Sequence, residues 1–184
     1  IHLYIQITQF YLKVMIKAIF FDRDGVLIKN YNYQYNVKKI KWLKGSIKSI
    51  KILNQNKIKV IVITNQSGIA RGIFKENQLK LFHEFMNKTL IKKNCKIDSF
   101  YFCPYHPKAT IKKYKRTTNL RKPGDGMIKL AKKKYNLKSS ECFMIGDQES
   151  DYLAAVKSKI KFEYKKKYSL EKQIRSILIK FNGK

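Results

Sequence analysis

Short apolar runs alternate along this chain with stretches in which apolar residues recur every three or four positions. A short run of β-branched and aromatic residues between polar residues is typical of a buried strand, and the wider spacing is typical of an amphipathic helix. These patterns predict four strands, at residues 18–21, 60–63, 99–103 and 142–145. They predict helices at residues 46–56, 77–92, 126–135, 149–158 and 169–181.

Three of the predicted helices carry a recognisable apolar face. The faces comprise Ile47, Ile50 and Leu53 in the first, Leu79, Phe82, Phe85, Met86 and Leu90 in the second, and Leu170, Ile174, Ile177 and Leu178 in the last. His83 lies within the second face, and we interpret it as a histidine of that helix face without a chemical role. Pro104 and Pro107 open a polar, non-periodic segment, so residues 108–119 are predicted to be a loop.

The strict alternation of strands and helices predicts βαβ units and therefore an α/β fold with a parallel sheet. In such sheets, ligands bind beyond the carboxyl ends of the strands. Polar residues follow three of the predicted strands: Asp22 and Asp24 follow the first, Thr64 the second and Asp147 the fourth. We therefore expect these side chains to meet in one crevice.

The length of 184 residues fits a single domain. The first 14 residues lack the basic start and the small-residue cleavage site of a signal peptide, and Met15 directly precedes the first strand. We therefore expect residues 1–14 to be an extension and residues 15–184 to be the domain. Three scattered cysteines favour a reducing, cytoplasmic setting. No apolar run is long enough to span a bilayer, and we expect a monomer.

The formal net charge of +29 has two interpretations. It could attract nucleic acid or another polyanion. It could instead reflect codon usage, because Lys, Ile and Asn are abundant, as an AT-rich genome would produce. Only five of the 41 basic residues are Arg, which is the preferred residue for bidentate phosphate and base contacts. The composition therefore favours codon usage and leaves nucleic acid as a second possibility.

The segment from Phe20 to Leu27 holds the strongest chemical signal, because two carboxylates, Asp22 and Asp24, stand two residues apart at the end of a buried strand. Gly25 allows a sharp turn there. Carboxylates this close repel each other unless a cation or a proton lies between them. Mg²⁺ binds one or two carboxylates together with substrate phosphate, so this arrangement points to a magnesium site.

Four motifs occur in a fixed order: DRDGVL, TNQSGIARG, RKPGDGM and IGDQESD, which together span residues 22–151. With these motifs the chain resembles the haloacid dehalogenase superfamily, and within it the heptose bisphosphate and histidinol-phosphate phosphatases. The resemblance implies a haloacid dehalogenase-like fold, which is a Rossmann-like three-layer sandwich. No long insertion follows the first motif or separates the second from the third, so no large cap domain is expected.

The resemblance also implies roles for five residues. Asp22 matches the nucleophile that becomes phosphorylated, and Asp24 matches the general acid and base. Asp22, the backbone carbonyl of Asp24, and Asp147 match the Mg²⁺ ligands. Thr64 and Lys122 match the groups that hold the transferring phosphoryl oxygens. On composition alone, Lys122 would be one more surface lysine, and its position in the RKP motif is what favours the functional interpretation.

Further positions resemble residues that contact substrate in this family: the segment after the first motif from Asn30 to Tyr33, and Asn65, Gln66, Ser67, Arg121 and Gln148. Gln148 replaces a lysine that is frequent in the family. Ser67 could instead only cap the following helix. Asp151 matches a supporting acid, for which a helix-capping or solvated role is an equally good interpretation.

The family usually holds a structural zinc ion in the loop before RKP, with a Cys-x-His pair and a later Cys-x-Cys pair. Here Cys103 is present, but Tyr105 stands at the expected His position, and Thr118 and Leu120 stand at the later Cys positions. A structural zinc site needs four ligands. We therefore predict that the zinc site is lost and that the loop is held by other packing or is mobile.

Three functions are compatible with these observations. The resemblance favours a Mg²⁺-dependent phosphatase for a small phosphorylated metabolite, with the 7-phosphate of a heptose 1,7-bisphosphate first and histidinol phosphate next. A polynucleotide 3′-phosphatase is the alternative that the charge would suit. A degenerate binding module is the third, and the presence of all five catalytic positions argues against it.

Overall fold

The fold is built around one sheet of five parallel strands in the order β3-β2-β1-β4-β5. The computed structural model describes residues 15–183, so the predicted extension at residues 1–14 lies outside the described part. The strands are β1 (Ala18–Phe21), β2 (Lys59–Asn65), β3 (Ser99–Cys103), β4 (Cys142–Gly146) and β5 (Lys161–Tyr164).

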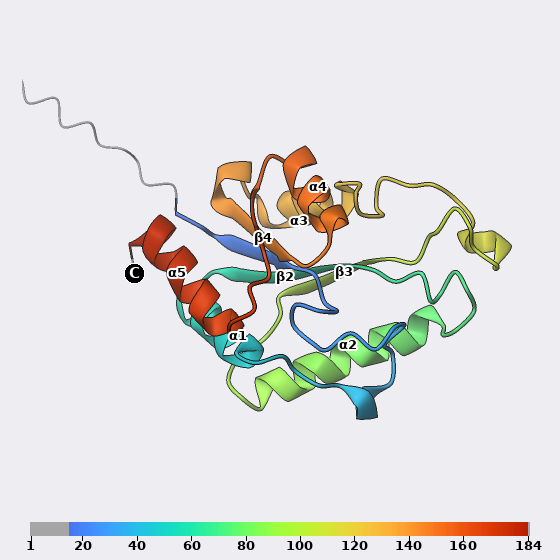
Figure 1. Cartoon of the computed structure of the whole chain (residues 1–184), viewed down its shortest axis with the longest axis horizontal. Coiled ribbons are helices and arrows are strands. Elements are labelled where there is room, and N and C mark those ends of the chain that lie inside the picture. The colour runs from blue at the N-terminus through green and yellow to red at the C-terminus, as the bar shows by residue number, and fades with distance from the viewer. Residues whose placement is uncertain (1–14, 184) are drawn as a thin grey trace, which may run out of the picture.

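Within residues 15–183, five α-helices cover the two faces of the sheet, which gives three layers (Figure 1). Helices α1, α2 and α5 lie on one face, and α3 and α4 lie on the other. Their bounds are α1 (Ser46–Gln55), α2 (Glu76–Ile91), α3 (Gly126–Tyr135), α4 (Glu149–Lys157) and α5 (Leu170–Asn182). Short 3₁₀ turns lie at Val37–Lys39, Lys112–Tyr114 and Ser139–Glu141.

Each face of the sheet has its own apolar core, because side chains of a strand alternate between the two faces. Ile19 and Phe21 of β1 pack with α1, α2 and α5, whereas Ala18 and Phe20 pack with α3 and α4. A strand that is buried on both faces reads as a continuous apolar run. The predicted α/β fold with a parallel sheet in a three-layer sandwich is thereby confirmed.

The structure departs from the predicted elements in two places. Strand β5 was not predicted, because its sequence KFEY mixes apolar and charged residues at a half-exposed edge. Phe85 was wrongly assigned to the apolar face of α2, because it is 42% exposed. It lies one position before Met86 and three after Phe82, where the helix surface has already turned toward solvent. His83 is buried within the same helix.

The carboxyl ends of the three central strands lie close together. Phe21 of β1 is level with Val62 of β2 and Ile145 of β4. The loops that follow these strands therefore start at one end of the sheet (Figure 1). No helix of the described part is both long and apolar enough to cross a membrane.

Candidate functional site

A cavity of about 440 Å³ opens at the carboxyl end of the central strands. Its lining residues come from the loops after β1, β2 and β4 and from the segment before α3. Eleven of the twelve site residues expected from the sequence line it: Asp22, Asp24, Asn30, Tyr33, Thr64, Asn65, Gln66, Ser67, Lys122, Asp147 and Gln148. Asn32, which lies inside the expected segment 30–33, and Ser150 also line it, and of these two only Ser150 was not predicted.

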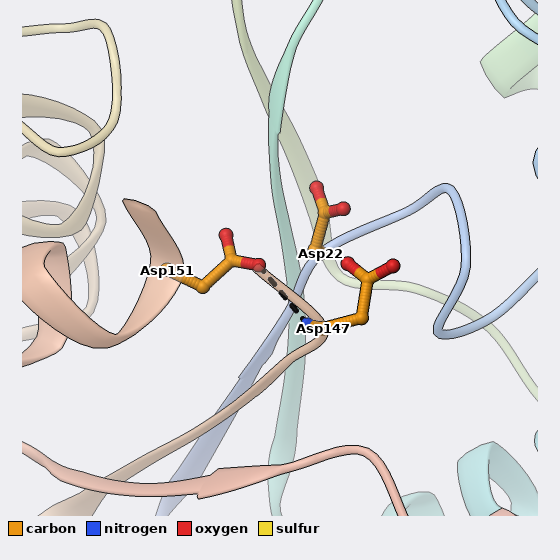
Figure 2. Close-up of side chains that lie close together, drawn as sticks. All are labelled: Asp22, Asp147 and Asp151. Carbon is orange, nitrogen blue, oxygen red and sulfur yellow. Dashed lines mark hydrogen bonds between the residues drawn. The ribbon is translucent and has the colours of Figure 1, made fainter. Parts of the chain in front are cut away.

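Three carboxylates cluster at this cavity: Asp22 and Asp147 line it, and Asp151 is buried beside them. One oxygen each from Asp22, Asp147 and Asp151 lies within 4.8 Å of the others. Figure 2 shows the carboxyl groups of Asp22 and Asp147 side by side, with Asp151 reaching toward them from α4. The second carboxylate oxygen of Asp151 accepts hydrogen bonds from the backbone N–H groups of Asp147 and Gln148, both at 3.1 Å. Asp151 therefore caps α4, and its full burial rules out a solvated role.

Lys122 reaches into the same cluster from the loop before α3. Its Nζ donates to Asp22 Oδ1 at 2.7 Å and to the carbonyl oxygen of Ile63 at 3.1 Å, and it lies 2.5 Å from Asp151 Oδ1. Burial alone would lower the pKa of Lys122, but the carboxylates of Asp22 and Asp151 raise it above its ordinary value. The ammonium group is therefore charged and fixed against Asp22.

Burial acts on the two acids that border the open part of the cavity. It raises the pKa of Asp22 to about 7, against the opposing attraction of the Lys122 ammonium. It also raises the pKa of Asp147, although a hydrogen bond from Gln148 works in the other direction. Acidic groups with raised pKa values in one cavity are typical of functional sites.

Two glycines allow this close approach. Gly25 has φ +85°, and a Cβ at this position would collide with the carboxylate of Asp147. A Cβ on Gly146 would overlap the side chain of Asp151. The backbone after β1 and the end of β4 can therefore bring the acids together only because these positions lack a side chain.

Asp24 lies at the edge of the cavity and faces its neighbour Arg23. Nη2 of Arg23 donates to Asp24 Oδ2 at 2.9 Å, and Gln66 Nε2 donates to the same oxygen at 3.0 Å. Gln66 Nε2 also lies 2.9 Å from Thr64 Oγ1. Gln66 therefore links the polar groups that follow β1 and β2. The expected part of the Asp24 backbone carbonyl in metal binding stays a prediction.

Asn65 holds the backbone of Lys122 at two points. Its Nδ2 donates to the carbonyl oxygen of Lys122 at 3.0 Å, and its Oδ1 accepts from the Lys122 N–H at 3.0 Å. Both polar ends of the amide are thus engaged by another segment of the chain. Asn65 lines the cavity, but these bonds make it a support for Lys122.

The rim of the cavity is built from a tight turn after the first motif. Asn32 and Tyr33 have positive φ values, 53° and 54°, and two successive left-handed residues bend the chain back over the opening. The N–H of Asn32 donates to Asn30 Oδ1 at 3.0 Å. Tyr33 remains 41% exposed, so its ring is accessible to a ligand.

Arg121 is the predicted substrate-binding residue that does not line the cavity. Its Nη1 donates to the carbonyl oxygen of Tyr105 at 3.5 Å. It borders a neighbouring depression, together with His106, Thr118 and Asn119. A contact of Arg121 with a ligand would therefore have to involve a group that extends beyond this cavity.

The loop in which the family usually binds zinc is held here by aromatic and ionic contacts. The guanidinium carbon of Arg116 lies 3.6 Å from the ring centre of Tyr105, and Tyr114 donates a hydrogen bond to Glu76 at 2.8 Å. Burial raises the pKa of the Cys103 thiol, which disfavours the thiolate that a metal needs. Nδ1 of His106 accepts from the N–H of Lys108. Packing therefore holds this loop.

The three-carboxylate cluster fits a divalent cation with oxygen ligands. Asp147 Oδ1 is buried and has no hydrogen-bond partner among residues 15–183. One ammonium group, Lys122, faces three acids, and burial raises the pKa of two of them. Mg²⁺ binds hard oxygen ligands and usually keeps positions open for phosphate. This arrangement can bind a cation and a phosphate group next to the carboxylate of Asp22.

The sequence missed the groups behind the cavity. Arg23 is fully buried and bonds to His83 of α2, 60 positions further along the chain. The unusual position of an arginine between two aspartates was the available signal for Arg23. Nothing in the helical spacing marked His83 as its partner.

The sequence of this chain is similar to a known family and to individual known proteins. The family model described as "Polynucleotide kinase 3 phosphatase" matches residues 17–175. A protein of Photorhabdus laumondii is 37% identical over 145 residues, which cover 79% of this chain and 77% of that protein. One of Escherichia coli K12 is 32% identical over 145 residues, which cover 79% and 76%. Both are named D-glycero-beta-D-manno-heptose-1,7-bisphosphate 7-phosphatase.

Solved structures share the fold. A haloacid dehalogenase-like phosphatase from Mesorhizobium loti matches with a TM-score of 0.74 and 27% identity, covering 79% of this chain and 70% of that one. The D,D-heptose 1,7-bisphosphate phosphatase of B. bronchiseptica, solved with magnesium and phosphate, matches with a TM-score of 0.76 and 23% identity. That match covers 90% of this chain and 99% of the other, and it supports the fold alone.

Proposed function

This chain belongs to the polynucleotide kinase 3 phosphatase family of haloacid dehalogenase-like phosphatases, and we propose from this that it removes the 7-phosphate of a heptose 1,7-bisphosphate. The observation that carries the proposal is the cavity in which Asp22, Asp147 and Lys122 converge beneath a short polar rim. Relatives at 32–37% identity bear the name of this activity for the β anomer, so the β-configured sugar is the first substrate to test.

Asp22 acts as the nucleophile in this proposal. One of its carboxylate oxygens attacks phosphorus, and the bond between phosphorus and the sugar oxygen breaks. Lys122 and Thr64 hold the phosphoryl oxygens, because stabilising their charge is most of what a phosphoryl-transfer enzyme does. Lys122 is already fixed against Asp22 at 2.7 Å, so it needs little rearrangement for this task.

Asp24 moves the protons. It gives a proton to the departing sugar oxygen in the first step and takes one from the attacking water in the second. The second step breaks the bond between phosphorus and Asp22 and restores the free carboxylate. Asp22 and Asp24 line the same cavity, which supports the proposal that both act on one bound phosphate.

Mg²⁺ is the cation we assign to the acidic cluster, with Asp22 and Asp147 as side-chain ligands and the Asp24 carbonyl as a third. When bound, it neutralises negative charge so that a phosphate can approach Asp22. Asp147 Oδ1 is buried without a partner and supports this assignment. Asp151 lies within 4.8 Å of both acids, but its bonds to Lys122 and to the start of α4 favour a supporting role.

Phosphate release with Mg²⁺ from heptose 1,7-bisphosphate, histidinol phosphate and a 3′-phosphorylated oligonucleotide tests the proposal. We expect the sugar bisphosphate to react fastest, with loss of the phosphate on carbon 7 as seen by ³¹P NMR. Chelation should abolish turnover, and Mg²⁺ should both restore it and raise the melting temperature of the metal-free protein. If histidinol phosphate or the oligonucleotide reacted fastest, the proposed substrate would be wrong.

The role of Asp22 is tested with a matched pair of variants. Asp22→Asn should lower turnover by about 10³-fold or more, because an amide is not a nucleophile. Asp98→Asn serves as the control, because Asp98 bonds to Lys59 and Val60 at the start of β2, away from the cavity. Equal activity of the Asp22 variant and the control would rule out the mechanism.

A polynucleotide 3′-phosphatase is the second candidate. The description of the family model and the net charge of +29 favour it. The charge would draw nucleic acid into the cavity, and that attraction weakens steeply as salt rises. A rate on the 3′-phosphorylated oligonucleotide that exceeds the rate on the sugar and falls steeply with salt would establish this candidate.

A further inference from the structure

Arg23 is a buried cation that the catalytic residues do not explain. Its side chain is fully buried and does not line the cavity. Its Nε lies 3.2 Å from both carboxylate oxygens of Asp24, and its Nη2 donates to Asp24 Oδ2 at 2.9 Å and to the carbonyl oxygen of Gln34 at 2.8 Å. A buried charge needs such partners to offset its lost hydration.

His83 of α2 completes the environment of Arg23. Its Nε2 lies 3.1 Å from Arg23 Nη1, and its ring stacks on Phe100 with centres 4.3 Å apart. Burial and the nearby guanidinium lower the pKa of His83 well below its ordinary value. Because an arginine nitrogen can only donate, Nε2 of the neutral ring accepts this bond. The guanidinium group also lies 4.8 Å from the ring centre of Phe82.

These contacts fix Arg23 from three sides. The carbonyl of Gln34, the ring nitrogen of His83 and the face of Phe82 leave its planar group one orientation. Its remaining donors point at Asp24, whose side chain is 18% exposed toward the cavity. The direction of the Asp24 carboxylate therefore depends on a helix that contributes none of the residues lining the cavity.

We propose that Arg23, held in place by His83, is a positioning residue that aims the carboxylate of Asp24 at the leaving oxygen of the substrate. This inference rests on the proposed function, because it takes Asp24 as the group that donates the proton. A purely structural role for Arg23 and His83 predicts instead that their loss lowers stability and affects every substrate alike.

The two roles differ in how they respond to the leaving group. An alkyl phosphate releases an alkoxide that needs a proton from Asp24, whereas p-nitrophenyl phosphate releases a stabilised phenolate that does not. The ratio kcat/KM covers only the steps up to departure of this group, so hydrolysis of the phosphorylated aspartate does not enter it. Comparing kcat/KM for heptose bisphosphate and p-nitrophenyl phosphate isolates the proton donation.

His83→Phe is the decisive variant, because it keeps a ring against Phe100 and removes the acceptor for Arg23. We expect its kcat/KM on the heptose bisphosphate to fall roughly 10-fold more than its kcat/KM on p-nitrophenyl phosphate. A general acid contributes about 10²–10⁴-fold to the rate, and misplacing it should remove part of that contribution. His83→Gln, whose amide oxygen can accept from Arg23, should restore most of the ratio. An equal loss on both substrates, or no loss, would overturn the inference.

Two further variants separate positioning from stability. Leu90→Ala removes a buried side chain from the same helix, so it should lower the melting temperature without changing the ratio of the two kcat/KM values. Arg23→Lys keeps the charge but cannot span Asp24 and His83, and it should show the same selective loss if His83→Phe does not fold. An unchanged ratio in Arg23→Lys would also overturn the inference.

The proposed function and the inference fail in different ways. If the unaltered protein releases no phosphate from either substrate with Mg²⁺, the proposed function is wrong and the inference falls with it. If the unaltered protein is active and Asp22→Asn is inactive, but His83→Phe keeps the ratio of the unaltered protein, only the inference is wrong.

Discussion

The amide of Asn65 joins two segments of the candidate site that are far apart in the sequence. Its oxygen and nitrogen both bond to the backbone of Lys122, across 57 positions of the chain. The resemblance assigned Asn65 to substrate binding, which stays a prediction; each end of the amide has formed one of its two possible hydrogen bonds, and both of these bonds go to Lys122. Its effect should instead reach the phosphate through the position of the Lys122 ammonium.

Asn65→Ala should lower kcat by roughly 10- to 100-fold on both heptose bisphosphate and p-nitrophenyl phosphate, because a small displacement of a catalytic group is costly. Asn87→Ala provides a matched control: Asn87 makes the same two-point contact with the backbone of Ile97, away from the cavity. Steady-state kinetics of both variants would check this. A rise in KM for the sugar alone, with kcat unchanged, would instead indicate direct substrate contact.

At the scale of elements, each α-helix ends close to a residue with left-handed backbone geometry. The residues are Lys57 after α1, Asn94 after α2, Asn136 after α3, Lys159 after α4 and Gly183 after α5. Such a residue stops a helix and directs the chain back toward the sheet. Gly and Asn tolerate this geometry, whereas a lysine pays a steric cost for its Cβ.

Lys57→Gly and Lys159→Gly should therefore each raise the free energy of unfolding by about 1 kcal/mol. In a protein of this size, that corresponds to a rise in melting temperature of about 2–4 °C. Lys57→Ala, which keeps the Cβ, should give no such gain. Thermal unfolding of the three variants would check this. A lower melting temperature in the glycine variants would show that the lysine side chains stabilise the protein by more than the backbone strain destabilises it.

The sequence was sufficient to locate most elements because their apolar patterns are strong. The predicted strand at residues 99–103 and the predicted helix at residues 126–135 coincide with β3 and α3. Strand β5 lies at the edge of the sheet and is half exposed, so its side chains carry little pattern. Its position depends on pairing with β4, which is a tertiary effect that local sequence does not encode.

The candidate site also had a part that the sequence predicted and a part that it did not. Residues after the strand ends, such as Asp22 and Asp147, could be placed in one crevice from topology and motifs. The pairing of Arg23 with His83 and the two bonds of Asn65 could not, because they join segments that are brought together only by the packed fold. Contacts between distant segments were therefore the part of the site that the sequence left open.

At the scale of the whole molecule, the main electrostatic feature is the net charge of +29. Eight ion pairs are found among the described residues, and Lys122 takes part in two of them, so most lysines of this part of the chain form no ion pair with an acid. Like charges on one compact surface repel each other and favour the expanded, unfolded chain. Dissolved salt weakens this repulsion, because it screens charges beyond about 10 Å at 0.1 M.

Raising NaCl from about 0.02 M to about 0.2 M should therefore raise the melting temperature by a few degrees. Sorbitol at matched osmolality is the control for effects unrelated to charge. Thermal unfolding at each concentration would check this. A melting temperature that stays flat or falls with NaCl would mean that the surface charges are already balanced by local pairing.

The central place of β1 also bears on how the chain folds during synthesis. β1 carries the residues that lead into Asp22, and it hydrogen-bonds to β2 on one side and to β4 on the other. A nascent chain that has reached α2 can pair the first side, but the second side stays an open strand edge until residues 142–146 leave the ribosome. Open edges recruit other chains. The interval between these two pairings is therefore when this protein is most prone to aggregate, and slower translation between β2 and β4 would lengthen it.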